Sequence, residues 1–250
     1  MQAYKLLSIT LFATLLASGA MAEETKTSSL SPEQKKEVEG IVRDMLNREP
    51  EMIESSLRAS LDKKQKEARD EANKAVKGAH KALYEDSEDP IIGNPKGTVT
   101  MVVFMDPYCG YCRKFQPLLH KAVKEHKDLK IIYKALPVLG PESKKAAEEE
   151  LAANCMGRFQ DYHEAVYESS VHSRKERMEL AEKNNIDTKA LKAGVASNKV
   201  DKHLERNAQL ASKLGIHGTP AFIIGEELFP GYMDKEQLDD LIKAASKKQG

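Results

Sequence analysis

Apolar residues first recur at helical spacing over residues 31–61, after an unpatterned polar stretch. Ser31 is a favourable N-cap, Pro32 suits the first helical position, and Gln34 stands where a capping box needs it. The apolar positions that follow on one face are Val38, Ile41, Val42, Met45 and Leu46. The pattern predicts a short amphipathic helix that ends before Pro50.

A second helix is predicted from near Glu51 to about Tyr84, where Ala, Lys, Glu and Arg dominate. Its apolar stripe is strong as far as Leu61 and then thins among charges, so the later part is predicted to be a solvated helical stalk. Two short helices cannot build a core alone. We expect the apolar face of residues 31–61 to be buried by a second copy of the chain, or alternatively by the remainder of the same chain.

Beyond residue 86 the pattern changes to strand, helix and strand. Residues 97–105 form a continuous apolar run, residues 112–124 have apolar side chains on one helical face, and residues 129–136 form a second apolar run. This order is a βαβ unit, so we expect the two strands to be parallel.

The remainder of the chain is predicted to be helical before it returns to strands. Residues 142–214 favour a series of helices, the last of which ends at Gly215. Residues 220–229 are typical of a β-hairpin, and Asp234 can cap a final helix. The outline is an α/β domain that contains a helical insertion.

The N-terminus resembles a secretory signal. A basic residue, Lys5, precedes the apolar run Leu6–Ala17, and Ala20 and Ala22 suit a signal peptidase. The run is shorter than the roughly 20 residues that span a membrane, so a retained anchor is the weaker alternative. The predicted division is a signal peptide (1–22), an N-terminal helical segment (23–61), a helical linker (62–85), and an α/β domain (86–250) with its insertion at about 141–214.

Composition excludes several classes of protein. The 250 residues carry 39 Lys and Arg against 39 Asp and Glu, which provides no basic field for nucleic acid. A mean hydropathy of −0.55 excludes a protein with many membrane spans. Three cysteines are too few to hold a chain of this length together, although an exported protein reaches a compartment where disulfides form.

The sequence Cys109-Gly110-Tyr111-Cys112 stands at the predicted junction of the first strand and its helix. At a helix N-terminus, unpaired N–H groups and the helix dipole favour a thiolate on Cys109. Cys112 lies one turn further along the same face and can attack a mixed disulfide on Cys109. The two cysteines are therefore the candidate catalytic pair, with Gly110 and Tyr111 as active-site neighbours.

Other roles for this pair fit less well. A zinc site needs four ligands, and the remaining cysteine, Cys155, stands alone. Covalent haem needs a His where Arg113 stands. A structural disulfide here would close too small a loop to restrict the unfolded chain much. We therefore expect no metal and no cofactor.

Cys155 and His217 are predicted to take no part in the chemistry. Cys155 lies among Ala152, Ala153 and Met156, which favours a small buried side chain over a regulatory thiol. The seven histidines show no metal-ligand spacing, and we expect His217 to be a solvated loop residue.

The segment Gly218-Thr219-Pro220 directly precedes the predicted hairpin. From about Leu83 to the C-terminus, the chain resembles the periplasmic thiol:disulfide interchange proteins of the DsbA family. The motifs that carry the resemblance are this segment, the C-x-x-C pair, Val103-Phe104-x-Asp106-Pro107 and Phe229-Pro230-Gly231-Tyr232. The N-terminal helical extension resembles oligomeric DsbA-like proteins or the related suppressor-of-copper-sensitivity proteins. The active-site motifs are more similar to the isomerases DsbC and DsbG.

The resemblance implies a thioredoxin-like fold with a helical insertion, plus an N-terminal helical oligomerisation segment. It also implies that the Thr219–Pro220 bond is cis and faces the dithiol, so that Thr219 and Pro220 bind the backbone of an extended substrate. The sequence departs from the family at two positions. Val103 stands where many DsbA-type proteins have a buried Glu, and the dipeptide between the cysteines lacks the His that monomeric DsbA has there. We expect a reduction potential between about −270 and −120 mV.

The sequence thus predicts a periplasmic thiol:disulfide oxidoreductase with disulfide isomerase activity. Its expected partners are exported proteins with missing or incorrect disulfides, a membrane redox partner, and a second copy of the chain bound through residues 31–61. One alternative is a dedicated oxidant that a membrane partner keeps disulfide-bonded. Another is a holdase or surface-binding protein that has lost catalysis.

Overall fold

The computed structural model describes residues 30–249. The predicted signal peptide (1–22) and the polar stretch after it lie outside the described residues. The described chain divides into two compact units, one that ends at Ala59 and one that begins at Ser60.

The first unit contains helix α1 (Pro32–Arg48) and the beginning of helix α2 (Pro50–Gly78). The predicted capping box is present, because the Gln34 N–H donates to Ser31 Oγ at 3.3 Å and the Ser31 N–H donates to Gln34 Oε1 at 2.9 Å. No residue of α1 is buried. The large apolar side chains of this unit are at least 38% exposed, and they are Leu30, Val38, Ile41, Val42, Met45, Leu46, Met52, Ile53 and Leu57.

The second unit begins within α2, which ends earlier than predicted. The helix stops at Gly78, and a separate short helix, α3 (His80–Tyr84), follows. The predicted solvated stalk is buried at its C-terminal end, because Val76, Ala79 and Leu83 are at most 5% exposed. The last turn of α2 therefore already packs on the core before the helix ends at Gly78, a residue that weakens helices.

Within the described residues, five strands form one mixed sheet in the order β1-β3-β2-β4-β5. The predicted strands are β2 (Val99–Met105) and β3 (Leu129–Ala135), which are parallel, and the hairpin is β4 (Ala221–Ile224) with β5 (Glu227–Pro230). Strand β1 (Ile91–Gly93) was not predicted, because three residues at a sheet edge carry too short a pattern.

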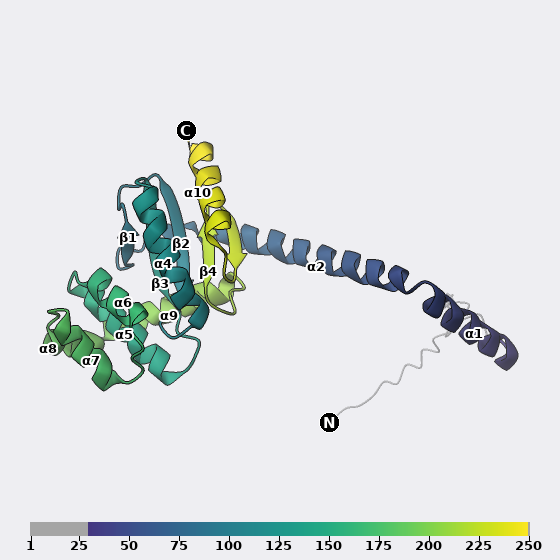
Figure 1. Cartoon of the computed structure of the whole chain (residues 1–250), viewed down its shortest axis with the longest axis horizontal. Coiled ribbons are helices and arrows are strands. Elements are labelled where there is room, and N and C mark those ends of the chain that lie inside the picture. The colour runs from purple at the N-terminus through teal and green to yellow at the C-terminus, as the bar shows by residue number, and fades with distance from the viewer. Residues whose placement is uncertain (1–29, 250) are drawn as a thin grey trace, which may run out of the picture. The chain divides into compact units, whose positions relative to one another are not determined.

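Helices cover both faces of this sheet (Figure 1). The first face packs on α4 (Gly110–Glu125) and α10 (Lys235–Gln249), together with part of the insertion. The second face packs on the end of α2, on α3 and on α9 (Asn198–Lys213). The other insertion helices are α5 (Pro141–Cys155), α6 (Phe159–Glu168), α7 (Arg174–Lys183) and α8 (Thr188–Val195).

These elements place the insertion between β3 and β4, as the pattern predicted. None of the helices in the described part of the chain has both the length and the apolar character needed to span a membrane.

Candidate active site

Cys109 is the N-cap of α4, and Cys112 lies in the first turn of that helix. The Cys109 N–H donates to the Asp106 carbonyl at 3.1 Å, and the Arg113 N–H donates to the Cys109 carbonyl at 3.0 Å. Cys109 is 8% exposed and Cys112 is 0% exposed, so the first sulfur lies nearer the surface than the second. The prediction that the pair stands at the junction of strand and helix is confirmed.

The Thr219–Pro220 peptide bond is cis, as the family resemblance implies. Strand β4 begins directly after it and pairs antiparallel with β2, the strand that leads to Cys109. This pairing brings together residues that are 110 positions apart, and the Cys109 thiol donates to the Thr219 carbonyl at 3.1 Å. The two motifs therefore form one site.

The two thiols have different surroundings. Burial raises the pKa of the Cys112 thiol well above its usual range, since a thiolate there would lose its hydration. Cys112 therefore stays protonated at neutral pH until a base removes its proton. This asymmetry suits a pair in which the less buried Cys109 meets the partner sulfur first.

Exposed apolar side chains lie beside the thiols. Tyr111 is 60% exposed and Tyr232 is 44% exposed, and their ring centroids are 6.2 Å apart. Val138 and Leu139, in the loop after β3, are also exposed. Such a rim can contact the apolar side chains of an unfolded polypeptide.

Asp106 anchors this rim, a role that its place in the sequence motif does not indicate. Its carboxylate is fully buried and accepts hydrogen bonds from the backbone N–H groups of Tyr108 at 2.8 Å, Val138 at 2.7 Å and Leu139 at 3.1 Å. The hydroxyl of Ser143 also donates to it. One carboxylate therefore joins the loop before Cys109 to the loop after β3.

The helical insertion is fastened to the same loop. Arg113 donates from Nε to the Pro107 carbonyl at 2.9 Å and from Nη1 to the Tyr167 carbonyl at 3.3 Å. Tyr108 donates from its hydroxyl to the His172 carbonyl at 3.0 Å. Two residues next to the cysteines thus hold the end of α6 and the loop after it against α4.

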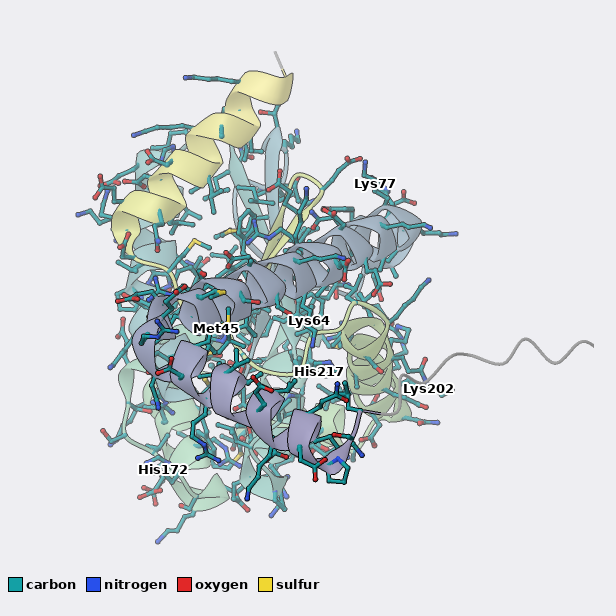
Figure 2. The ribbon with its side chains drawn as sticks, turned by 90° about the vertical axis from the view of Figure 1, so that its right-hand side faces the viewer. Met45, Lys64, Lys77, His172, Lys202 and His217 are labelled. Atoms are coloured by element: carbon teal, nitrogen blue, oxygen red, sulfur yellow. The ribbon has the colours of Figure 1, made fainter. Side chains whose placement is uncertain are left out.

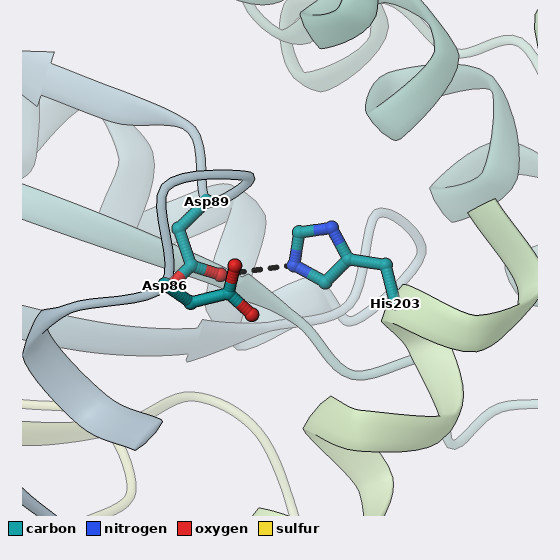
Figure 3. A group of neighbouring side chains, drawn as sticks. All are labelled: Asp86, Asp89 and His203. Carbon is teal, nitrogen blue, oxygen red and sulfur yellow. Dashed lines mark hydrogen bonds and ion pairs between the residues drawn. The ribbon is translucent and has the colours of Figure 1, made fainter. Parts of the chain in front are cut away.

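One group of three side chains in the described part of the chain could offer ligand atoms to a metal. Asp86, Asp89 and His203 place such atoms within 4.8 Å of one another (Figure 3). His203 Nε2 is 2.9 Å from Asp89 Oδ1, the Lys134 ammonium pairs with the other oxygen of Asp89, and Arg206 pairs with Asp86. Each carboxylate already has a protein cation, so the group fits an ion-pair cluster better than a cation site.

The prediction that Cys155 is buried is wrong, because its side chain is exposed. Cys155 is the last residue of α5, and Ala152 and Ala153 take the inward positions at 0% exposure. The apolar neighbours thus indicated a buried helix face that Cys155 does not share. His217, labelled in Figure 2, is exposed as predicted. It lines a groove beside α2.

Comparison with known proteins agrees with this site. Residues 85–244 match the family model described as thioredoxin. A linker-deletion variant of Proteus mirabilis ScsC is 30% identical, with a TM-score of 0.68 over 89% of this chain and 99% of that one. The thiol-disulfide exchange protein alpha-DsbA2 of Wolbachia pipientis is 25% identical, with a TM-score of 0.65 over 69% of this chain and 95% of that one.

A curated relative is similar over the same region. Disulfide bond formation protein D of Bacillus subtilis is 23% identical over 167 residues, which cover 62% of this chain and 75% of that protein. The family match spans more than half of the chain and includes both cysteines and the cis proline. The chain belongs to the thioredoxin family and is a thiol-disulfide oxidoreductase of the thioredoxin and DsbA type.

Proposed function

We propose that the protein is a periplasmic thiol:disulfide oxidoreductase that reshuffles incorrect disulfides in exported proteins. Cys109 attacks a substrate disulfide to form a mixed disulfide, and Cys112 resolves it. The observation that carries this proposal is the meeting of Cys109 and the cis-proline loop, where the thiol lies 3.1 Å from the Thr219 carbonyl.

Thr219 and Pro220 are proposed to hold the substrate backbone. When the Cys109 sulfur enters a mixed disulfide it no longer donates a hydrogen bond to the Thr219 carbonyl, which then becomes free to accept an N–H from an extended segment. Gly110 and Tyr111 stand beside this position, and the 60% exposed ring of Tyr111 offers apolar contact.

A homodimer is proposed to form through residues 31–61. Ile41 is 60% exposed and Leu57 is 57% exposed, and the other large apolar residues of this segment are also exposed. Nine such side chains on one short segment exceed what a monomer usually leaves in water. A second copy of the same segment offers the matching apolar face, and two active sites in one particle help to retain a misfolded substrate.

The dimer is tested with paired charge substitutions in the full mature chain. Ile41→Glu with Met45→Glu places two charges on the apolar face of α1, and we expect light scattering to show monomers. The control is Lys36→Glu with Arg43→Glu on the polar face, which changes the net charge more and should leave the dimer intact. Unchanged mass and unchanged refolding of scrambled ribonuclease in the first variant would contradict the dimer and its role.

The direction of electron flow is tested by trapping thiols in cells. An isomerase is expected to keep Cys109 and Cys112 reduced, whereas a dedicated oxidant that a membrane partner re-oxidises is expected to keep them as a disulfide. Cys109→Ser separates both enzymes from a holdase, because a protein that only binds would keep its function. Finding the pair mostly oxidised would replace the isomerase proposal with the oxidant.

A further inference from the structure

The groove beside α2 opens next to the cis-proline loop. Its volume is about 780 Å³, which lies within the range of about 300–1,000 Å³ that is usual for ligand-binding clefts. One wall is α2, and the other is the end of α9 with the loop that follows it. Strand β5 contributes Leu228 and Pro230, and all of the lining residues belong to the second unit.

The α9 wall is fixed by the way the helix ends. Gly215 follows α9 with a φ of +70°, and the Ile216 N–H donates to the Ala211 carbonyl at 2.9 Å. Ile216 is buried and anchors the loop in the core, whereas the next residue, His217, is exposed and lines the groove. Thr219 follows two residues later, a stretch of at most about 7 Å. The groove therefore begins beside the proposed substrate position.

The α2 wall is fastened to the hairpin of β4 and β5. Asn73 Oδ1 accepts a hydrogen bond from the Leu228 N–H at 3.1 Å, and Lys77 Nζ lies 2.9 Å from a carboxylate oxygen of Glu226. Val76, in the same turn of the helix, is buried in the core. Both walls are thus held in place by contacts within the second unit.

Strand β5 is the edge of the sheet, but it is a poor template for a further strand. The N–H of Leu228 already donates to Asn73, and Pro230 has no N–H to offer. A polypeptide in the groove would therefore bind through its side chains rather than by extending the sheet.

The lining combines apolar surface with an excess of positive charge. Its apolar side chains are Ala68, Ala72, Ala75, Leu214, Leu228 and Pro230. Its charged side chains are two cations, Arg69 and Lys213, and one acid, Glu71. This balance favours a ligand that has apolar side chains and a negative charge.

We propose that the groove binds the stretch of a substrate polypeptide that adjoins its reactive cysteine, with a preference for apolar side chains accompanied by an acidic one. The inference rests on the proposed role of Cys109. A substrate that is bonded to Cys109 and paired with the Thr219 carbonyl lies beside His217, where the groove begins. This continuity favours a substrate over a second copy of the chain as the occupant. The N-terminal helix α2 then forms one wall of the substrate site.

The test measures how fast Cys109 reacts with disulfides of different length. Cysteine peptides are joined through a disulfide to thionitrobenzoate. Cys109 attacks the peptide sulfur, the disulfide between Cys109 and the peptide forms, and thionitrobenzoate leaves as a coloured thiolate. The extended peptide has apolar residues and one Asp on each side of its cysteine, and a matched peptide has Lys in place of Asp. The short reference is N-acetylcysteine joined to the same group.

Two pairs of variants in the full mature chain separate the groove from the rest of the surface. Ala72→Trp fills the groove, whereas Lys74→Trp adds the same ring to an exposed position of the same helix outside the lining. Lys213→Glu reverses a charge in the lining, whereas Lys202→Glu makes the same change elsewhere on α9 (Figure 2).

We expect the extended Asp peptide to react about tenfold faster than the short disulfide. Ala72→Trp should remove most of this gain and Lys74→Trp should keep it, while the short disulfide reacts equally fast in every variant because Cys109 is unchanged. The Asp peptide should react about threefold faster than the Lys peptide, as befits exposed charges. Lys213→Glu should abolish that preference, and Lys202→Glu should retain it.

A gain that survives in Ala72→Trp, or that is lost equally in Lys74→Trp, would overturn the inference. Loss of dimer mass by light scattering in Ala72→Trp would also overturn it, because a second copy of the chain would then occupy the groove. Equal rates for the Asp and Lys peptides would overturn the charge preference. If Ala72→Trp does not fold by circular dichroism, Ala68→Trp decides by the same criteria.

Failure of the inference and failure of the proposed function give different results. If the unsubstituted protein releases no thionitrobenzoate even from the short disulfide, the proposed function fails. If the short disulfide reacts as fast as the extended peptide, only the groove inference fails.

Discussion

Asp106→Asn tests whether one buried carboxylate holds the active-site loops together. Asp106 is 0% exposed, and one of its oxygens accepts from Val138 and Leu139 while the other accepts from Tyr108 and the Ser143 hydroxyl. Asparagine has almost the same shape but replaces one oxygen with an NH₂ group, which cannot accept. The substitution therefore removes acceptor capacity with little change in volume.

The expected loss of stability follows from this arrangement. In the better orientation the NH₂ group faces the Tyr108 N–H and can donate to the Ser143 hydroxyl, so one buried backbone donor loses its partner, at a cost of about 1–3 kcal/mol. The hydrogen bonds from the Val138 and Leu139 N–H groups then go to a neutral oxygen instead of a charged one, which lowers the stability by roughly 0.5–1 kcal/mol for each bond. We expect the free energy of unfolding to fall by about 3 kcal/mol.

Urea unfolding followed by circular dichroism measures this change at constant m-value. Asp62→Asn on an exposed part of α2 makes the same chemical change and should cost less than about 0.5 kcal/mol. We also expect Asp106→Asn to weaken peptide binding more than exchange with a small thiol, because the loop that carries Val138 and Leu139 loses its anchor. A loss below about 0.5 kcal/mol in Asp106→Asn would mean that the carboxylate does not hold these loops together.

Three more predictions concern other parts of the chain. Burial raises the pKa of Tyr84 to about 12, so the folded state keeps the neutral hydroxyl that donates to the Gly225 carbonyl. The unfolded chain loses this proton near pH 10, so stability should fall as pH rises from about 10 to about 12. Ultraviolet titration should show a tyrosine ionising near pH 12 that is missing in Tyr84→Phe. Leu83→Ala should lower the free energy of unfolding by about 2–5 kcal/mol, because the side chain is fully buried. Val138→Ala, at a side chain that is 46% exposed and lies outside the proposed dimer segment, should change it by less than about 0.5 kcal/mol, as chemical denaturation would measure. Cys155 should react quickly with a thiol reagent in the folded protein, and slow labelling until denaturant is added would contradict its exposure.

Much of the candidate site could be predicted because its signals are local. The C-x-x-C pair at the start of a helix requires only the apolar run before it and the helical period after it. The cis Thr219–Pro220 bond was predictable only through family resemblance, since nothing in the neighbouring residues requires it. The contact between Cys109 and Thr219 depends on the pairing of β2 with β4, which residue order alone does not state.

The buried carboxylate behind the site could not be predicted. Asp106 is an acidic residue that composition places on the surface by default, yet it is fully buried and hydrogen-bonded. Its partners lie up to 37 positions away, so no short window of sequence contains them. Cys155 shows the opposite error, because an apolar stretch suggested burial for a residue that ends its helix at the surface.

The capping box of α1, the order of β2, α4, β3, the insertion and the final hairpin, and the position of the dithiol at a helix N-terminus all follow from the order of residues along the chain. Each of these depends on residues within about four positions of one another, which is the reach of backbone hydrogen bonding and helical period. The tertiary structure alone decided which side chains are buried and which distant groups meet at Cys109 and Asp106. Burial and charge pairing depend on contacts between elements, and those exist only once the sheet has brought its strands and helices together.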